Sequence, residues 1–225
     1  ALAQAGAEVL LLSRTAKEIE EVASDIISTG GKAKAIPCDV TDSQAVKKVF
    51  AALGSLDVLV NNAGSNIPEP FVEVSEAHLD RLLDLNVRAA FIVAQAAASR
   101  MLASPNRYAR AIINMSSQMG HVGAVNRSVY CLTKHALEGL TKAMALELAP
   151  HGIRVVSIAP TFVETPLTKP MFAKPEFAQW VRERIPNGQL GQVEDVAAAV
   201  VFAASPAAAL VTGSNLLVDG GWTAQ

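Results

Sequence analysis

The chain of 225 residues is 51% hydrophobic and 18% charged, and its formal net charge is −2 at pH 7. This near-neutral balance, without a run rich in Lys or Arg, argues against nucleic acid or an anionic membrane surface as the main partner. The length suits one large α/β domain with a sizeable core, so we expect a single domain over residues 1–225.

The longest purely apolar run, VAAAVVFAA at 196–204, is much shorter than the roughly 20 residues that a membrane-spanning helix needs. No basic segment precedes the first apolar run, so the sequence indicates no secretory signal. The four His have no metal-ligand spacing, and Cys38 and Cys131 form no C-x-x-C pair. We therefore expect a soluble, cytoplasmic protein without a metal site.

Short apolar runs alternate with longer segments of helical period along the chain. The predicted strands are 8–12, 33–37, 56–62, 110–117, 153–160 and 215–221, and the predicted helices are 15–28, 42–53, 75–102, 127–149 and 193–204. Residues 161–192, which are rich in proline, interrupt this order as a partly helical excursion. Strands rich in Val, Ile and Leu that are each followed by a helix are typical of parallel sheets covered on both faces. The sequence predicts a doubly wound, Rossmann-like three-layer sandwich with a mostly parallel sheet.

Polar residues follow the predicted strands, at the edge of the sheet where ligands of such folds bind. They are Ser13-Arg14, Asp39-Val40, Asn61 to Gly64, Ser116-Ser117 and Pro160. Each group taken alone has an ordinary explanation as a turn, a helix cap or loop chemistry. Their coincidence at one edge of one sheet indicates a binding site.

Tyr130 and Lys134 lie four positions apart in a mostly apolar segment, which makes them neighbours on one helix face, with Cβ atoms roughly 5–6 Å apart. A cation beside a phenol stabilises the phenolate and lowers the pKa of the tyrosine, which suits a general acid/base. Ser117 could hydrogen-bond the same reacting oxygen. The alternative is a core tyrosine with its hydroxyl satisfied and a lysine that extends to the surface.

The chain resembles the short-chain dehydrogenases/reductases. The resemblance depends on motifs in the family's order and spacing along the whole chain: NNAG at 61–64, LNV at 85–87, INMSS at 113–117, YCLTK at 130–134, ETP at 164–166 and VDGGW at 218–222. It implies an NAD(P)-dependent enzyme that interconverts a ketone and a secondary alcohol. Tyr130 would be the acid/base, Ser117 would polarise the substrate oxygen, and Lys134 would lower the tyrosine pKa and bind the nicotinamide ribose. Asn86 would hold a water that links Lys134 to solvent.

The resemblance also implies the cofactor contacts. Asp39 would meet the adenine amino group, Val40 would pack on the ring, and Asn61, Ala63 and Gly64 would line the adenosine side. Pro160, Val163 and Thr165 would lie near the nicotinamide. The first strand ends in Ser13-Arg14, without a carboxylate before Glu18. Because an Arg there accommodates a 2′-phosphate, we expect NADP(H) to be favoured over NAD(H). The alternative is that Arg14 only covers the adenine face, which is compatible with NAD.

Two features depart from the family pattern. The family opens with a strand and a glycine-rich turn that cradles the pyrophosphate, whereas residue 1 matches the helix that follows. We expect the complete protein to carry that segment, and the alternative is an inactive fragment. Thr161 stands where the family usually has Gly after Pro160.

The substrate is the least defined part. Segment 161–192 resembles the family's variable substrate lid. Four polar residues lie close to Ser117 and Tyr130 in the sequence: Gln118, His121, Asn126 and Arg127. If they face the pocket, they favour a sugar, sugar acid or polyol as the substrate. The alternatives are reduction of a 3-oxoacyl thioester and a catalytically silent cofactor-binding scaffold. Family resemblance and the small residues at 89–98 also lead us to expect a homotetramer, with a dimer as the alternative.

Overall fold

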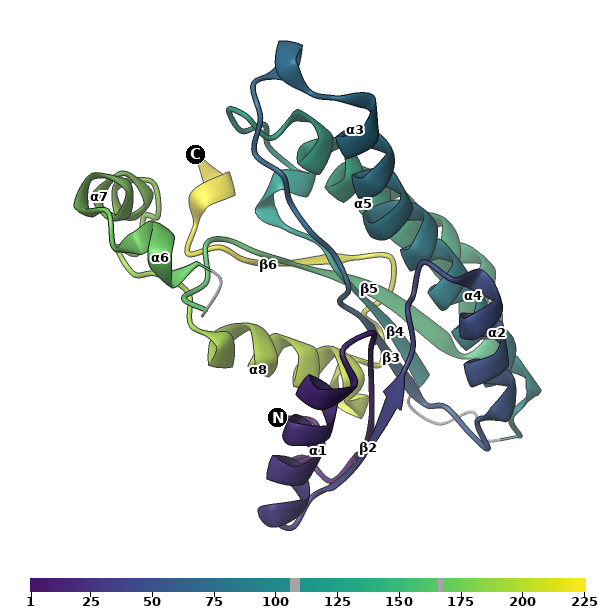
Figure 1. Cartoon of the computed structure of the whole chain (residues 1–225). Coiled ribbons are helices and arrows are strands. Elements are labelled where there is room, and N and C mark those ends of the chain that lie inside the picture. The colour runs from purple at the N-terminus through teal and green to yellow at the C-terminus, as the bar shows by residue number, and fades with distance from the viewer. Residues whose placement is uncertain (106–109, 166–167) are drawn as a thin grey trace.

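We analysed a computed structural model, which describes residues 1–105, 110–165 and 168–225 (Figure 1). The strands are β1 (Glu8–Ser13), β2 (Lys32–Pro37), β3 (Val58–Asn61), β4 (Arg110–Met115), β5 (Ile153–Pro160) and β6 (Asn215–Val218). The α-helices are α1 (Ala16–Ser28), α2 (Ser43–Ala52), α3 (Glu76–Leu83), α4 (Ala90–Ala103), α5 (Ser128–Leu148), α6 (Lys169–Phe172), α7 (Pro175–Glu183) and α8 (Val193–Ala204). Every predicted strand and helix is present, and the boundaries move by a few residues.

All strand pairs are parallel, and the strands form two sheets with the orders β1-β2 and β3-β4-β5-β6. In the larger sheet Asn61 pairs with Asn114, and Met115 pairs with Ile158. The carboxyl ends of β3, β4 and β5 therefore meet at one edge. The predicted Rossmann-like α/β architecture is confirmed, although β1 and β3 share no ladder in the described chain. Glu8 of β1 is exposed and its other side chains are only half-buried, in contrast to those of β4 and β5.

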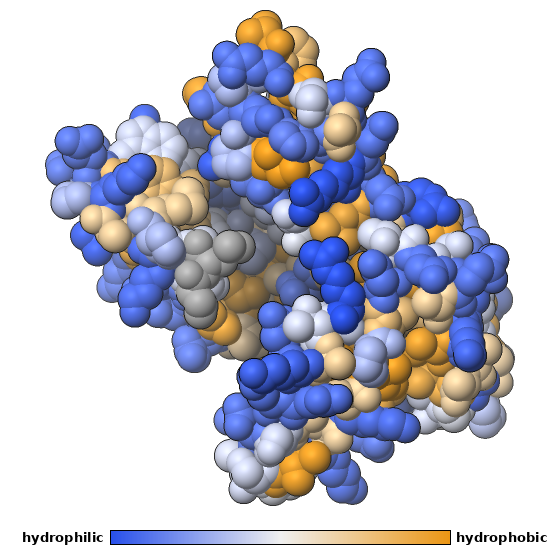
Figure 2. Space-filling model, in the orientation of Figure 1, coloured by the Kyte–Doolittle hydropathy of each residue, from blue (hydrophilic) through white to orange (hydrophobic). Residues whose placement is uncertain are grey.

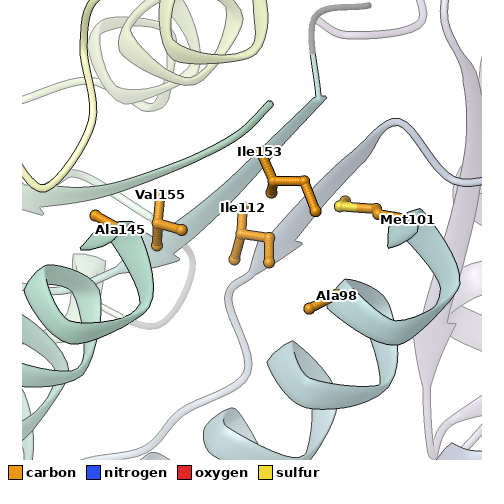
Figure 3. Close-up of a cluster of buried hydrophobic side chains, with 6 residues drawn as sticks. All are labelled: Ala98, Met101, Ile112, Ala145, Ile153 and Val155. Atoms are coloured by element: carbon orange, nitrogen blue, oxygen red, sulfur yellow. The ribbon is translucent and has the colours of Figure 1, made fainter. Parts of the chain in front are cut away.

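The core of the larger sheet has two faces, and consecutive strand residues alternate between them. On one face Ile112, Ile153 and Val155 pack against Ala98, Met101 and Ala145 of helices α4 and α5 (Figure 3). On the other face Ile113, Val156 and Ile158 pack against α8. Figure 1 shows α4 and α5 on one side of the sheet and α8 on the other. This is the three-layer arrangement that the apolar strands predict.

The predicted helix 75–102 is one helical run, Glu76–Ala103, with a π-helical turn at Asp84–Ala89 between α3 and α4. By length and composition alone this run could cross a membrane. Its apolar residues have a different role here, because Val93, Ala97 and Met101 are buried in the core. Packing on the sheet accounts for the apolar character of this helix.

Arg154 on β5 caps the carboxyl end of α8. Its Nη1 donates to the Ala203 carbonyl (2.7 Å) and its Nη2 donates to the Ser205 carbonyl (3.2 Å). A guanidinium at this helix end satisfies carbonyls that have no partner inside the helix, and its charge complements the helix dipole. The contact fixes α8 against the sheet.

We predict that Arg154→Met lowers the free energy of unfolding by about 2 kcal/mol, because buried carbonyls lose a charged donor. Arg182→Met on the exposed side of α7 is the matched control and should change stability by less than about 0.5 kcal/mol. Urea unfolding of both variants measures the difference. Equal effects would contradict the assigned role of Arg154.

Candidate active site

The candidate site lies at the carboxyl edge of β3, β4 and β5, where helix α5 begins. Ser117 follows β4 and caps the short 3-10 turn Gln118–Gly120, its hydroxyl accepting a hydrogen bond from the Met119 amide (3.2 Å). Tyr130 and Lys134 lie in the first turns of α5. Figure 2 shows the surface hollowed between the α6–α7 segment at the left and the region of α3 and α5 at the top. The chain therefore brings the predicted serine, tyrosine and lysine to one sheet edge.

Lys134 is buried and its ammonium donates to the Met115 carbonyl at the end of β4 (2.7 Å). The same Nζ lies 5.5 Å from the centre of the Tyr130 ring. Burial lowers the pKa of Lys134 to about 8, while the carboxylate of Glu138 opposes that shift. Near neutral pH the site thus contains a buried cation whose charge depends on its surroundings.

The pKa of Tyr130 differs from the sequence prediction. Burial raises the pKa of this phenol above its ordinary value, and the hydrogen bond with Ser117 and the nearby Arg127 lower it only in part. The predicted net lowering of the Tyr130 pKa is therefore wrong for this structure. The physical reason is that desolvation dominates, while the Lys134 ammonium is directed to a backbone carbonyl. Tyr130 is a protonated phenol at neutral pH.

Asn86 lies in the π-helical turn, and its side chain is almost fully buried. Its amide donates to the Ser65 carbonyl (2.8 Å) and to the Thr133 hydroxyl (3.2 Å). Its oxygen accepts from the Ser65 backbone N–H (2.8 Å). Asn86 thus connects the chain after β3 to helix α5. The water that the resemblance places on Asn86 stays a prediction.

Two glycines allow close approach at this edge. A Cβ on Gly64 would lie 3.3 Å from Asn86 Oδ1 and 3.8 Å from Lys134 Nζ. A Cβ on Gly120 would lie 2.9 Å from Ser116 Oγ and 3.1 Å from the Lys134 carbonyl. The loops after β3 and β4 therefore pack directly against the lysine segment.

Asn61 ends β3, as predicted, and its side chain turns into the fold. Its side chain is buried, and its amide donates to the Ala90 carbonyl (2.8 Å) and more weakly to Asn114 (3.4 Å). Asn114 donates in turn to the Thr141 hydroxyl (2.9 Å). This chain of hydrogen bonds ties β3, β4, α4 and α5 together. The Asn61 side-chain amide is thus engaged in an internal contact, and its predicted place on the adenosine side stays a prediction.

A cavity of about 330 Å³ adjoins the ends of β1 and β3. Of the residues predicted to contact the cofactor, Arg14 and Gly64 line it, and the prediction missed the others: Thr41, Ser65, Arg81, Asp84 and Leu85. Thr41 and Ser65 directly follow the predicted residues Val40 and Gly64, so extending each motif by one residue would have found them. Arg81, Asp84 and Leu85 reach the cavity from the helix, and nothing in the strand-end pattern points to them.

Asp39 and Val40 follow β2. The Asp39 carboxylate accepts from the Thr41 backbone N–H (2.9 Å) and hydroxyl (2.7 Å), and these bonds lower its pKa, with a smaller contribution from Arg14. Val40 packs on the apolar cluster around Phe50. Arg14 supplies a positive charge, Asp39 supplies an ionised carboxylate, and Gly64 leaves the cavity open. This set of groups suits a nucleotide.

The chain after β5 is held in a compact loop. Val163 pairs with Gly191, the Thr165 backbone N–H donates to the Thr168 hydroxyl (2.9 Å), and this hydroxyl donates to the Val163 carbonyl (2.6 Å). Pro160 ends β5 at the site edge. Pro166 of the predicted ETP motif lies outside the described residues. The Thr161 hydroxyl is buried without a partner in the described chain.

The candidate substrate residues separate into two groups. Arg127 lies close enough to Tyr130 to act on its phenol, and it donates to the Asn126 carbonyl (3.1 Å). Gln118 is buried rather than projecting from a solvated loop, and its Oε1 has no partner among the described residues. His121 Nε2 lies 3.7 Å from the Glu138 carboxylate. Of Arg127, Gln118 and His121, Arg127 is the one whose described interactions include the Tyr130 phenol.

Segment 161–192 contains helices α6 and α7 and an aromatic cluster that the sequence reasoning missed. Phe162, at the base of the segment, contacts Phe177 of α7 and Trp222 near the C-terminus, with ring centres 5.7 Å apart in both pairs. Trp180 also contacts Trp222 (5.8 Å), and Arg184 lies over the Trp180 ring (4.2 Å). These rings attach the segment to the last turn of the chain.

No group of three or more His, Cys, Asp or Glu side chains suited to a metal occurs in residues 1–105, 110–165 and 168–225. The site chemistry available here consists of a phenol, a hydroxyl and a buried ammonium. These three groups can bind a carbonyl or alcohol oxygen and move one proton.

Known proteins match the chain along its whole length. A family model described as enoyl-(acyl carrier protein) reductase matches residues 1–223. L-xylulose reductase of Mus musculus is 38% identical over 224 residues, which are 100% of this chain and 89% of that protein. Gluconate 5-dehydrogenase of Gluconobacter oxydans is 38% identical over 226 residues, covering 99% of this chain and 87% of that protein.

A solved structure extends the likeness to three dimensions. Gluconate 5-dehydrogenase from Burkholderia cenocepacia, in complex with NADP and tartrate, superposes with a TM-score of 0.93 at 32% identity. The match covers 100% of this chain and 88% of that one. With the serine, tyrosine and lysine at one sheet edge, these matches show that the chain belongs to the short-chain dehydrogenase/reductase family.

Proposed function

We propose that this protein is an NAD(P)-dependent oxidoreductase that interconverts a ketone and a secondary alcohol on a small sugar, sugar acid or polyol. The observation that carries the proposal is the convergence of Ser117, Tyr130 and Lys134 at the carboxyl edge of the sheet, with Lys134 Nζ 5.5 Å from the Tyr130 ring centre. Matched relatives named for xylulose and gluconate support the substrate class.

Tyr130 is the proton donor and acceptor of the proposed reaction. Its raised pKa keeps the phenol protonated at neutral pH, so in the reductive direction it can give its proton to the oxygen that develops negative charge. The Ser117 hydroxyl, next to the phenol, binds the same oxygen and orients it. The nearby Lys134 ammonium stabilises the phenolate left behind.

A bound nicotinamide dinucleotide would supply the hydride. The strand-end residues would hold its adenosine half, and Lys134 with the loop after β5 would face the nicotinamide half. We assign to this role Ser13, Arg14, Asp39, Val40, Asn61, Ala63, Gly64, Tyr130, Lys134, Pro160, Val163 and Thr165. Asn61 would contribute its backbone, because its side-chain amide is engaged with Ala90. Arg14, exposed beside the cavity, favours NADP(H) over NAD(H).

We propose that the substrate pocket lies between Tyr130 and segment 161–192. This segment would act as a lid within a single domain. Arg127 supplies a positive charge near the phenol, which suits a sugar acid or a hydroxyl-rich ketone. A 3-oxoacyl thioester is the second candidate, supported only by the acyl carrier protein in the name of the matching family model, which itself denotes reduction of an enoyl double bond.

The protein is further proposed to be a cytoplasmic homotetramer. Large apolar side chains are exposed on α4 and α5, including Phe91, Leu132 and Leu146, which suits helix pairing between copies. Both cysteines are free, as in a reducing compartment. Light scattering of the full-length protein measures the assembly, and a monomer would contradict this part of the proposal.

We predict that Tyr130→Phe lowers kcat by about 10²–10⁴-fold, because the proton donor is lost. Binding of NADPH, followed by its fluorescence, should remain within a few-fold of the unmodified protein. Unchanged turnover in Tyr130→Phe would refute the mechanism. If the unmodified protein binds NADPH but turns over no substrate, the catalytically silent cofactor-binding scaffold would be favoured instead.

We predict that Arg14→Ala lowers kcat/KM with NADPH by about tenfold or more. This factor corresponds to the loss of roughly 1.4 kcal/mol of binding free energy from one charged hydrogen bond. The value with NADH should change by less than a few-fold, because NADH lacks the 2′-phosphate. Lys17→Ala, an exposed change at the second residue of α1, is the control. Equal losses with both cofactors would argue for the stacking role of Arg14 and against an NADP preference.

A substrate panel tests the remaining part of the function. L-xylulose, 5-ketogluconate and other polyol-derived ketones should be reduced with higher kcat/KM than 3-oxoacyl thioesters, since the pocket edge carries Arg127. Steady-state rates with NADPH and NADH give the comparison. A preference for the thioester would replace the proposed substrate class.

A further inference from the structure

Helix α5 carries a third polar residue on the face of Tyr130 and Lys134. Glu138 follows Lys134 by one helical turn, and its side chain is buried. One carboxylate oxygen accepts from the Ser157 hydroxyl (2.7 Å), and the other accepts from the Asn215 amide (3.1 Å). The same amide also donates to the Ser157 hydroxyl (2.9 Å). Neither of these donors, on β5 and β6, carries a charge.

A buried carboxylate that is bound only by neutral donors retains its charge at a cost, unless a cation lies nearby. In the described chain the basic side chain within ion-pair distance of Glu138 is His121, at 3.7 Å, and it is 30% exposed. The buried cation beside Glu138 on the same helix face is Lys134, and the Glu138 carboxylate acts on its charge.

The packing around Gly120 holds these groups in place. A Cβ at this position would lie 3.1 Å from the Lys134 carbonyl and 3.2 Å from Glu138 Cγ. The turn Gln118–Gly120 therefore lies directly on α5 between Lys134 and Glu138. Charges in such a dry, close-packed contact interact more strongly than charges in water.

The groups that face Lys134 come from four elements. Tyr130 and Glu138 lie on its own helix, the Met115 carbonyl comes from β4, and His121 reaches the Glu138 carboxylate from the turn after Ser117. The neutral Asn86 approaches from the π-helical turn, in contact with Gly64. Within the described chain, Glu138 is the anion that acts on the lysine.

We propose that Glu138 is a positioning residue of this site, whose buried carboxylate keeps the Lys134 ammonium protonated and seated on the Met115 carbonyl beside Tyr130. The inference rests on the proposed function of the Tyr130–Lys134 pair. Burial already lowers the pKa of Lys134 to about 8, so removing the carboxylate brings the lysine closer to neutrality at working pH. Tyr130 then loses the cation that stabilises its phenolate.

The test measures the titration of Lys134 directly. In full-length protein with ¹³Cε-labelled lysine, the Lys134 signal is assigned by its loss in Lys134→Met and followed from pH 6 to 10. Glu138→Gln should lower its midpoint by about one pH unit, because an opposite charge that favours the ammonium is removed. Glu138→Asp keeps the charge and should restore most of the midpoint. Ser157→Ala removes a hydrogen bond but no charge, and should lower Tm without moving the midpoint.

The pH profile of kcat provides the second readout. The alkaline limb, where Lys134 loses its proton, should move to lower pH in Glu138→Gln by the same amount as the titration midpoint. If Glu138→Gln does not fold, Glu138→Met removes the charge with an apolar side chain of similar length, and the same shift is expected.

The outcomes separate the two proposals. A lower Tm with activity reduced equally at every pH, and with an unmoved Lys134 midpoint, would overturn the inference and leave Glu138 a structural residue. A moved midpoint in a protein without turnover on any substrate would support the inference on charge and reject the proposed function.

Discussion

The hydrogen bond from the Lys134 ammonium to the Met115 carbonyl connects helix α5 to the end of β4, and the geometry of the site depends on it. The bond sets the rotation of α5 over the sheet edge. Because residues four apart share a helix face, the same rotation brings Tyr130 toward Ser117 and Glu138 toward Ser157. A helix turned by one residue would direct these side chains elsewhere.

The parallel register places the ends of three strands level with this helix. Asn61 pairs with Asn114, and Met115 pairs with Ile158, so the segments after β3, β4 and β5 leave the sheet at one height. Asn61, Asn114 and Thr141 then join the strand ends to the helices by side-chain hydrogen bonds. A buried polar network with satisfied partners fixes one arrangement more strictly than apolar packing does.

Much of the fold could be predicted from the sequence because its apolar residues recur with the spacing typical of strands or of helices. Ile112 and Ile113 already show a strand buried on both faces, and Tyr130 with Lys134 defines a helix face. The π-helical turn at Asp84–Ala89 was not predictable, because no local pattern marks it and the partners of Asn86 within it, Ser65 and Thr133, are distant in the sequence. The raised pKa of Tyr130 was missed for a similar reason, since the depth of burial is a property of the packed molecule.

The network around Glu138 also lay beyond the sequence pattern. Ser157 and Asn215 are separated from Glu138 by 19 and 77 positions, and nothing local marks either as its partner. In the same way, Thr41 and Leu85 meet at one cavity only after β2 and the helical run have been placed. The spacing of residues within one helix or strand can be read from the sequence, whereas contacts between different elements become visible only in the folded structure.

The aromatic cluster gives segment 161–192 a property of its own. Trp180 and Trp222 are the chain's two tryptophans, and their rings lie 5.8 Å apart across the contact between helix α7 and the last turn of the chain. The intrinsic fluorescence of the protein therefore originates almost entirely from this one junction. Any displacement of α7 from the C-terminal turn changes the surroundings of both indoles, so the molecule contains a built-in optical reporter of that movement.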